Sequence, residues 1–563
     1  MYGAAVTRTP ASSVRHASHR LRGLIALSLV VPFTVAACVT ITDTGPAASG
    51  GAPGQTAGAT AGASSSVATP TPRPTPEPTP EPLDAVVFGF LPYWLAERAA
   101  EALDPSLLTT VTWHGVEASG DGRIVSKKSN GDIPPGWAGM ETEAFDQLKQ
   151  RLQAAGVEVA LTVQRFGWTD GAAKRTKNLL TDRKDRRKLA DRIAALVAER
   201  GFDGVNLDFE PMPADLADEY AAFVREVRAA LDAVEPGQHL SVDVHPSLTG
   251  YDLAALTADD AADLAILMAY EYRGAGAGLA SSIAPLSDPA TNDIESTVAA
   301  ALEQVEPGKL VLGLPWYGRA WSTETPDGRS ATLSGRDIDA PATVSYALAV
   351  EQAELFGRRY QPDQASAWTV YPTQSCSSCD AVWRQVWYDD PDSFGAKIDL
   401  AVEQGLGGVG MWALGHEDGR EELWWALRNK IQQRADDAPP NGNAALDTSA
   451  SRRERDGIPV VSGSVPLRLI ASDAGDGTGL GYVRVGLAPE LDGRDRLTTG
   501  RTYPATESLE FALGDPATGG SAEDGPRAVH VQWRDLAGNW SAPIVIDVWV
   551  EDPDPAPSLA QGS

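Results

Sequence analysis

The 563-residue chain is short of the residues that most often build metal and redox centres. It contains three cysteines and seven histidines, and no histidines form the His-Glu-x-x-His pair that holds zinc on one face of a helix. No glycine-rich phosphate-binding motif and no Gly-x-Ser-x-Gly nucleophile turn stands out. The sequence therefore predicts no metal and no cofactor, and it does not support nucleotide-dependent or serine-nucleophile chemistry.

Positive charge is also scarce. The 47 lysines and arginines are outnumbered by 76 aspartates and glutamates, which gives a net charge of −29 at pH 7. Because such a chain repels polyanions, we expect neither nucleic acid nor anionic cell-wall polymers as partners attracted by charge. A neutral polysaccharide is compatible with this charge. The 15 tryptophans suit either a large core or stacking against sugar rings.

The N-terminus is predicted to be an export signal rather than part of the fold. Four arginines in the first 22 residues precede an apolar run from Gly23 to Ala37, which is too short for a membrane-spanning helix. The segment Val35-Ala36-Ala37-Cys38 resembles a bacterial lipobox. This resemblance implies that residues 1–37 are a lipoprotein signal peptide and that Cys38 is lipidated, anchoring the chain to the membrane. An ordinary signal peptide is the alternative, and both place the chain outside the cytoplasm.

The other two cysteines form the motif Cys376-Ser377-Ser378-Cys379. A zinc site would need a second pair of ligands, and a redox role is a further alternative. In an oxidising compartment, we expect a disulfide between Cys376 and Cys379 at the tip of a hairpin.

Composition divides the chain into segments. Residues 38–82 are rich in small residues and end in a proline repeat, so they are predicted to be a disordered, extended spacer. Residues 83–436 alternate between strand and helix patterns. Residues 437–456 are interpreted as a linker, residues 457–552 as a β-sandwich and residues 553–563 as a disordered tail.

Eight short apolar runs separated by helical patterns predict a (β/α)8 TIM barrel within residues 83–436. The runs are Val86–Leu91, Thr110–Gly115, Val157–Val163, Gly204–Phe209, Leu240–Val244, Leu264–Ala269, Lys309–Leu314 and Gly408–Trp412. A doubly wound parallel sheet is the alternative from the pattern alone. About ninety residues separate runs seven and eight, so we expect an insertion there.

The C-terminal region has the texture of an all-β domain. Its predicted strands are Val465–Ile470, Gly481–Leu487, Ala528–Trp533 and Ile544–Val550. The segment Asp535–Ser541 resembles the closing turn of bacterial Ig-like or fibronectin-like modules, which implies such a module here. The segment Asp473–Gly477 is interpreted as a solvated turn, with a calcium loop as the alternative.

The segment Asp203-Gly204-Val205-Asn206-Leu207-Asp208-Phe209-Glu210 carries the candidate chemistry. On a strand, Asn206, Asp208 and Glu210 share one face, and successive side chains on that face lie roughly 6–7 Å apart. Two carboxylates this close do not both ionise freely, so one is held as an acid near neutral pH. Cleavage of a glycosidic bond needs such an acid. An acidic strand end or a metal-binding loop is the alternative.

This segment resembles the Asp-Gly-x-Asp-x-Asp-x-Glu signature of glycoside hydrolase family 18, the chitinase-like family. Asn206 stands where most members have Asp, as in the branch with spore-cortex-lytic N-acetylglucosaminidases. Three further segments resemble family motifs: Met268-Ala269-Tyr270-Glu271, Leu314–Arg319 and Gly410-Met411-Trp412. The Ser-x-Gly-Gly motif often found on the third strand is absent, which leaves the substrate subclass open.

The resemblance implies a role for each matched residue. Glu210 protonates the leaving oxygen, Asp208 stabilises the substrate's acetamido group, and Tyr270 hydrogen-bonds the acetamido oxygen. Further residues are expected to bind substrate: Asn206, Met268, Glu271, Trp316, Tyr317, Arg319 and Trp412. Arg319 is expected to pair with Glu271, and the amide of Asn206 to favour the charged form of Asp208. His114 and His245 are either cleft residues or structural histidines.

The sequence therefore predicts an exported, monomeric glycosidase that cleaves β-1,4 bonds in N-acetylglucosamine-containing glycans. The resemblance implies a retaining, substrate-assisted mechanism. Chitin-type oligomers, peptidoglycan and N-glycan cores all remain candidate substrates. The alternative function is a non-catalytic, lectin-like surface lipoprotein, although such lectins usually lose the acid that Glu210 represents.

Overall fold

The computed structural model describes residues 85–553, except 433, 448–452, 474–476 and 493–495. The predicted signal peptide, the lipidation site Cys38, the spacer and residues 554–563 lie outside the described residues. Within the described part, each helix is too short or too polar to cross a membrane.

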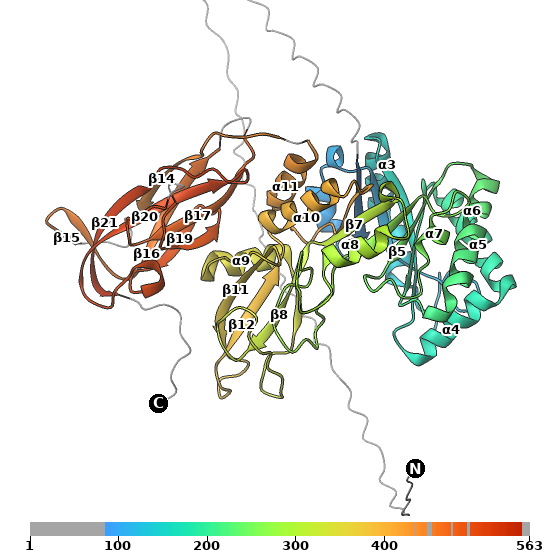
Figure 1. The fold of residues 1–563 in the computed structure, drawn as a ribbon, viewed down its shortest axis with the longest axis horizontal. Coiled ribbons are helices and arrows are strands. Elements are labelled where there is room, and N and C mark those ends of the chain that lie inside the picture. Colours follow the sequence, from blue (N-terminus) through green and yellow to red (C-terminus); the bar gives the residue numbers. More distant parts are fainter. Residues whose placement is uncertain (1–84, 433, 448–452, 474–476, 493–495, 554–563) are drawn as a thin grey trace, which may run out of the picture. The chain divides into compact units, whose positions relative to one another are not determined.

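Eight parallel strands form a closed barrel, of which β5 and β7 are labelled in Figure 1. Their order is β1-β13-β7-β6-β5-β4-β3-β2. The strands are β1 (Val86–Pro92), β2 (Thr110–Glu117), β3 (Glu158–Phe166), β4 (Gly204–Glu210), β5 (His239–Val244), β6 (Leu264–Met268), β7 (Leu310–Pro315) and β13 (Gly408–Trp412). Each predicted run coincides with one of these strands, so the TIM barrel is confirmed. The doubly wound alternative is wrong, because β1 pairs with β13 and closes the sheet.

Helices follow most of the barrel strands and cover the outside of the barrel. In chain order they are α1 (Ala96–Ala102), α2 (Pro135–Met140), α3 (Glu143–Ala154), α4 (Asp170–Thr181), α5 (Arg183–Arg200), α6 (Ala217–Val234), α7 (Leu253–Leu256), α8 (Ile294–Leu302), α10 (Pro391–Glu403) and α11 (Glu422–Ile431). Local sequence sets their ends. Asp182 accepts two backbone N–H groups at the start of α5, and Gly201 ends it with φ 63°. The chain can therefore reverse directly into β4.

β4 shows how the fold positions polar groups. Its outward side chains Val205, Leu207 and Phe209 are fully buried, and the Phe209 ring lies 5.3 Å from that of Phe223 on α6. Because side chains alternate along a strand, Asn206, Asp208 and Glu210 face the barrel interior. The apolar contacts with α6 thus fix the face on which the carboxylates lie.

The expected insertion lies between β7 and β13. It contains a five-stranded sheet in the order β10-β11-β12-β8-β9 and the helix α9 (Tyr346–Phe356). Its strands are β8 (Tyr317–Thr323), β9 (Ala342–Ser345), β10 (Arg359–Gln361), β11 (Ser366–Thr373) and β12 (Val382–Tyr388). The structure joins Cys376 and Cys379 in a disulfide in the turn between β11 and β12.

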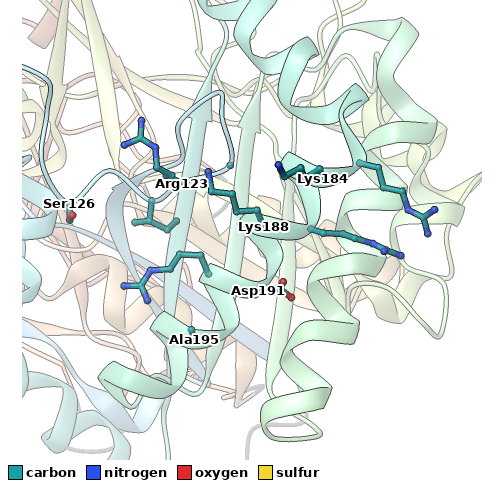
Figure 2. Close-up of a pocket in the computed structure, with 11 residues that line it drawn as sticks. Arg123, Ser126, Lys184, Lys188, Asp191 and Ala195 are labelled. Atoms are coloured by element: carbon teal, nitrogen blue, oxygen red, sulfur yellow. The ribbon is translucent and has the colours of Figure 1, made fainter.

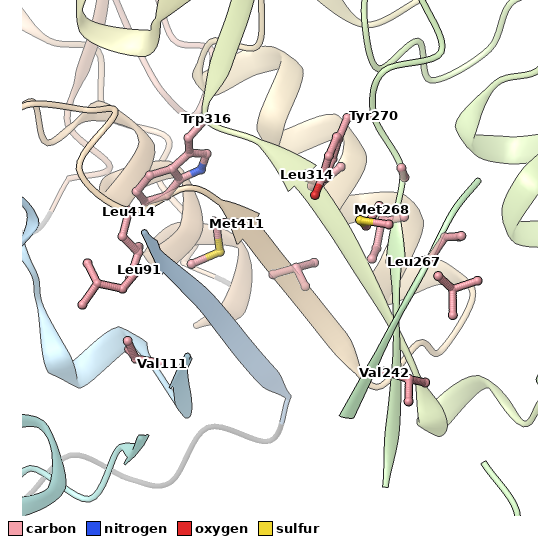
Figure 3. Packing of buried hydrophobic residues seen from close by; sticks show 14 of the residues in the cluster. Leu91, Val111, Val242, Leu267, Met268, Tyr270, Leu314, Trp316, Met411 and Leu414 are labelled. Atoms are coloured by element: carbon pink, nitrogen blue, oxygen red, sulfur yellow. The ribbon is translucent and has the colours of Figure 1, made fainter. Parts of the chain in front are cut away.

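One continuous core links the barrel to its helices and the insertion (Figure 3). The side chains of Leu91, Val111, Val242 and Met411 come from four barrel strands and are almost fully buried. Trp316, at the start of the insertion, belongs to the same core. The insertion therefore packs as part of the barrel domain.

The C-terminal region is an all-β domain with its own hydrophobic core. Its strands are β14 (Asn441–Leu446), β15 (Glu454–Arg455), β16 (Ile458–Ser472), β17 (Leu480–Gly486), β18 (Arg501–Pro504), β19 (Ser508–Ala512), β20 (Gly525–Asp535) and β21 (Ile544–Pro553). The main sheet has the order β14-β16-β21-β20-β17-β18. The predicted C-terminal all-β domain is confirmed, and each of its four predicted strands overlaps an observed one.

The predicted linker 437–456 is wrong in part, because residues 441–446 form β14. This strand pairs antiparallel with β16 and buries Ala444 in the domain core. Its neighbours Asn441 and Asn443 are exposed, and their polarity masks the strand pattern in the sequence. The all-β domain therefore begins about fifteen residues earlier than predicted.

A buried ion pair holds α10 against the end of β12. Lys397 on α10 contacts Asp389, and both side chains are almost completely buried. Burial lowers the pKa of Lys397 and raises that of Asp389 to about 6, while the opposite charges counteract both shifts. Each charge is tolerated in the core because the other is present.

Lys397→Met should reduce the free energy of unfolding by about 3–5 kcal/mol, because it leaves Asp389 buried without a countercharge. Urea unfolding followed by tryptophan fluorescence measures the loss. The double variant Asp389→Leu/Lys397→Met should regain most of it, since neither charge then remains. Lys430→Met is the control, because its ion pair with Asp399 is partly exposed and should contribute less than about 1 kcal/mol. Wild-type stability of the Lys397→Met variant would contradict this account.

Candidate active site

A cleft of about 320 Å³ opens at the carboxyl ends of the barrel strands. Parallel barrels carry their functional side chains at this end. The lining includes Asp208 and Glu210 from β4, Asp243 from β5, and Trp412 from β13. A groove of about 1060 Å³ elsewhere is larger, but its lining includes no pair of carboxylates. The strand-end cleft is therefore the candidate for chemistry.

Four carboxyl groups line the cleft, and three of them, Asp208, Glu210 and Asp243, form a cluster on β4 and β5. Asp208 and Asp243 are only 4% and 2% exposed, and they lie on neighbouring strands. Burial raises the pKa of Glu210 to about 7. Burial also raises the pKa values of Asp208 and Asp243, and repulsion from Glu210 adds to both increases. The cluster therefore retains protons near neutral pH, and Glu210 can act as an acid.

Asn206 lies below this cluster and does not line the cleft. It is fully buried, and its amide donates to Asp243 Oδ1 at 2.9 Å and to Ser241 Oγ at 3.1 Å. Thr162 donates to its Oδ1 at 3.1 Å. The expectation that this amide favours charged Asp208 is wrong, because both N–H groups are directed at β5. Within the described residues, Asp208 Oδ1 has no hydrogen-bond partner.

Glu271 and the insertion form one wall of the cleft. Tyr317 donates a hydrogen bond to Glu271 Oε1 at 2.8 Å, and the Arg319 guanidinium pairs with the same oxygen. Both partners lie on β8, the first strand of the insertion. The structure thus forms the expected pair between Arg319 and Glu271. Tyr270 also lines the cleft, and burial raises the pKa of its hydroxyl, which stays protonated and able to donate.

Aromatic rings cover much of the remaining surface. The Trp412 ring meets His114 edge-on with centroids 4.7 Å apart and lies 5.4 Å from the Phe90 ring. Trp94 and Trp168 also line the cleft but are 53% and 61% exposed. Such exposed indole faces can stack on the apolar face of a sugar ring.

The two histidines left open by the sequence both line the cleft. Burial lowers the pKa of His114 to about 3, so its imidazole is neutral. The pKa of His245 is also lowered by burial, and its Nδ1 lies 3.0 Å from Ser247 Oγ. Neither imidazole carries a positive charge at neutral pH.

Trp316 is predicted to bind substrate, and the structure places it elsewhere. Its side chain is fully buried in the core cluster (Figure 3). Its ring centroid lies 4.8 Å from that of Trp424 and 6.0 Å from that of Phe394. Trp316 lies between the end of β7 at Pro315 and the start of β8 at Tyr317. Its ring packs against α10 and α11 instead of entering the cleft. Met268, in contrast, lines the cleft as predicted.

Sequence reasoning missed Asp243, Trp94 and Trp168. Asp243 has a signal in the sequence, because Ser241 and Asp243 alternate with apolar residues on a predicted buried strand. Polar residues at the inward positions of such a strand indicate a site. The two tryptophans lie in connections after β1 and β3 and carry no comparable pattern.

One group of carboxylates in the described residues has the spacing of a metal site. Oxygens of Asp436, Asp473 and Asp535 lie within 4.8 Å of one another. Backbone N–H groups already donate to all three carboxylates: Thr478 to Asp436, Gly479 to Asp473, and Gly538 to Asp535. Each carboxylate of the group thus has a hydrogen-bond partner within the protein, and residues 474–476 of the predicted turn Asp473–Gly477 lie outside the described residues.

Comparison with known proteins gives a consistent result. The model of "Glycosyl hydrolases family 18" matches residues 72–417. A "Putative sporulation-specific glycosylase YdhD" from Bacillus subtilis is 29% identical over 41% of this chain and 51% of its own length. A "Probable endochitinase" from Caenorhabditis elegans is 25% identical over 51% of this chain and 48% of its own. The chain thus spans about half the length of these curated relatives.

Solved structures share the fold. A plant class V chitinase mutant from Cycas revoluta, solved in complex with (GlcNAc)3, aligns with a TM-score of 0.51, 21% identity, and coverage of 62% of this chain and 99% of its own. A chitinase-like agglutinin from Robinia pseudoacacia aligns with a TM-score of 0.51, 20% identity, and coverage of 61% and 99%. At this identity the likeness shows the fold alone.

Asp243→Asn should weaken the dependence of stability on pH. Where folding raises the pKa of a carboxyl, protonation of that carboxyl stabilises the folded state. This stability is fully present below the pKa of the unfolded state and is lost as pH rises through the pKa of the folded state. For Glu210 that pH window runs from 4.5 to about 7, and for Asp243 it begins at 3.8 and extends upward because burial raises the pKa of its carboxyl. The melting temperature of the wild type should fall between pH 5 and pH 8, and that of Asp243→Asn should fall less.

Asn206→Asp serves as the opposite control for this measurement. It adds a carboxylate beside Asp243, so the melting temperature should fall more steeply with pH than in the wild type. Parallel pH dependences for all three proteins would show that the cluster carries no such linkage.

Proposed function

Because the chain belongs to glycosyl hydrolase family 18, we propose that it hydrolyses β-1,4 bonds in N-acetylglucosamine-containing glycans. One observation carries this proposal. Glu210, with its pKa raised to about 7, shares a cleft with Asp208, Asp243 and the Trp412 ring. A carboxyl that is still protonated near neutral pH can donate a proton to a leaving oxygen.

In the proposed reaction, Glu210 gives its proton to the glycosidic oxygen as the bond from C1 to that oxygen breaks. The oxygen of the substrate's own 2-acetamido group forms a bond to C1, which produces an oxazolinium ion. Water then attacks C1, and the Glu210 carboxylate takes a proton from that water while the bond to the acetamido oxygen breaks. Two displacements retain the configuration at C1, and Glu210 regains its proton.

Asp208 and Tyr270 suit the acetamido group. Asp208 Oδ1 is a buried acceptor without a partner in the described residues, and an acetamido N–H would satisfy it. As positive charge develops on the oxazolinium ion, an ionised Asp208 would stabilise it. The protonated Tyr270 hydroxyl is able to donate to the acetamido oxygen. Beyond the effect of burial, the charge of Asp243 raises the pKa of Asp208. The amide of Asn206 donates a hydrogen bond to Asp243 and holds the Asp243 side chain in place.

The shape of the cleft supports a chain-like sugar substrate. A cavity of about 320 Å³ is at the lower end of small-molecule sites and can enclose a single sugar residue. Trp94 and Trp168 at the cleft are exposed and offer stacking surfaces for neighbouring sugars. The names of the relatives, which include di-N-acetylchitobiases as well as an endochitinase, support an N-acetylglucosamine substrate. The presence of Glu210 and Asp208 favours hydrolysis over non-catalytic binding.

The sequence supports further proposals about the whole chain. We propose that it is exported, lipidated at Cys38 and held from the membrane by the spacer 38–82. We also propose that the C-terminal domain is an Ig-like or fibronectin-like module, that the barrel domain spans residues 83–436, and that the protein is a monomer.

Glu210→Gln should lower kcat by about 10²–10⁴-fold on a chromogenic N-acetylchitooligosaccharide, since an amide cannot donate the proton. Its affinity for an unlabelled oligosaccharide, measured by calorimetry, should change little because the side chain keeps its shape. Glu417→Gln is the matched control, because burial also raises the pKa of Glu417 to about 7 and it does not line the cleft. Activity of Glu210→Gln within twofold of the wild type would refute the proposal.

The substrate should need a 2-acetamido group. A cellobioside with the same chromogenic leaving group should react more than about 10⁴-fold more slowly, because it lacks the internal nucleophile. A thiazoline analogue of the oxazolinium ion should inhibit competitively. The comparison of kcat/KM between the two chromogenic substrates is the measurement. Comparable values would rule out substrate-assisted catalysis while leaving Glu210 as the acid.

A further inference from the structure

The charge of the chain reverses locally along α4 and α5. Residues 174–192 contain nine lysines and arginines and three aspartates, a local net charge of +6 within a chain of net charge −29. Most of these side chains are exposed, and Arg186 is the buried exception. A basic segment of this density on an acidic protein marks a region where an anion is locally attracted.

Five of the nine cationic side chains, all on α5, line a groove of about 1060 Å³ on the outside of the barrel (Figure 2). One wall is the segment Gly122–Ser126, which follows β2, and the other is α5. Six cationic side chains and one acidic side chain line it: Arg123, Arg183, Lys184, Arg187, Lys188, Arg192 and Asp191. In Figure 2, Lys184, Lys188 and Arg123 follow one another across the upper part of the groove.

Existing ion pairs leave part of this charge uncompensated. Arg123 pairs with Asp121, Arg187 with Glu226 and Arg192 with Glu199. In the part of the chain that the structure describes, no carboxylate lies within ion-pair distance of Arg183 or Lys184. Lys188 donates to a backbone carbonyl, that of Asp121. Beyond the hydrogen bond from Ser119, the charge of Lys188 also lowers the pKa of the Asp121 carboxyl, but Lys188 and Asp121 lie beyond ion-pair distance. In the described residues, Arg183, Lys184 and Lys188 thus lack a direct ion pair and remain available to an anionic ligand.

The cations repeat along the helix. Arg183 and Lys184 are followed one turn later by Arg187 and Lys188, which places cationic pairs about 6 Å apart along the groove. The groove begins at the segment after β2 and reaches Ala195 on the fourth turn of α5. It therefore runs from the end of the barrel that carries the cleft down the side of the barrel, and it matches an extended chain of regularly spaced anions.

We propose that this groove binds a linear polymer of phosphate diesters joined by short polyol links. Its lining lacks aromatic side chains, which single-stranded nucleic acid needs for base stacking. Its concavity, with Ile124 and Ala195 only partly exposed, suits a narrow chain better than a flat lipid surface. Because the rest of the chain is acidic and repels polyanions, we expect a polyanion to bind at this groove alone.

A poly(glycerol phosphate) oligomer is the probe, with binding to the full chain measured by calorimetry between 50 and 200 mM NaCl. The triple variant Arg183→Gln/Lys184→Gln/Lys188→Gln should lower the affinity at least about tenfold at 50 mM. It should also reduce the slope of log affinity against log salt by about 2, since each neutralised phosphate contributes about 0.7. Hydrolysis of a small chromogenic substrate and the melting temperature should not change, because these side chains are exposed and distant from the carboxyl cluster.

The matched control is Arg151→Gln/Arg336→Gln/Arg468→Gln, which removes three exposed charges outside the groove. It should retain wild-type affinity for the polymer, and an equal loss in both triple variants would overturn the proposal. Three further arms test other sources of phosphate: inorganic phosphate, oligodeoxythymidylate and vesicles containing phosphatidylglycerol. Full displacement of the polymer by inorganic phosphate at equal phosphate concentration would overturn the proposal. Tighter binding of the oligonucleotide or the vesicles would do the same.

Discussion

The two-sided character of β4 is the constraint on which the site depends. Leu207 and Phe209 are held in the helix layer by apolar contacts, so Asp208 and Glu210 must face the barrel interior. A shift of one residue in register would exchange the two sets and destroy both the core and the site. Pairing with β3 and β5 fixes that register. The hydrophobic core therefore determines the chemistry as directly as the carboxylates do.

Burial of acidic groups links the site to a cost in stability. Asp208, Glu210 and Asp243 destabilise the folded protein when they ionise, and their raised pKa values express that cost. Below them, Thr112, Thr162, Asn206 and Ser241 form a chain of hydrogen bonds. A neutral amide at position 206 supports Asp243 without adding a fourth negative charge. Position 206 on β4, where most members of the family carry Asp, is thus neutral in this chain. The nearby carboxyl is that of Asp243 on β5, to which the Asn206 amide donates.

The sequence allowed much of this to be predicted. Each barrel strand is an apolar run between helical patterns, and Glu210, Asp208 and Tyr270 belong to motifs at strand ends. Trp316 was misplaced because a motif names a residue without giving the direction of its side chain. Asp243 was missed although it alternates with apolar residues on its strand, because its proximity to Asp208 follows from the position of β5 beside β4. The groove was missed because net charge averages over the chain and hides a local excess of arginine and lysine.

The contact of Glu271 with the insertion has a consequence for how members of this family diversify. Tyr317 and Arg319 belong to the insertion sheet, yet they hold a residue that follows β6. Exchange of the insertion between relatives would therefore alter the wall of the cleft as well as the periphery of the barrel. The shape of the cleft wall and the sequence of the insertion are therefore expected to change together during evolution, as one inherited unit rather than two.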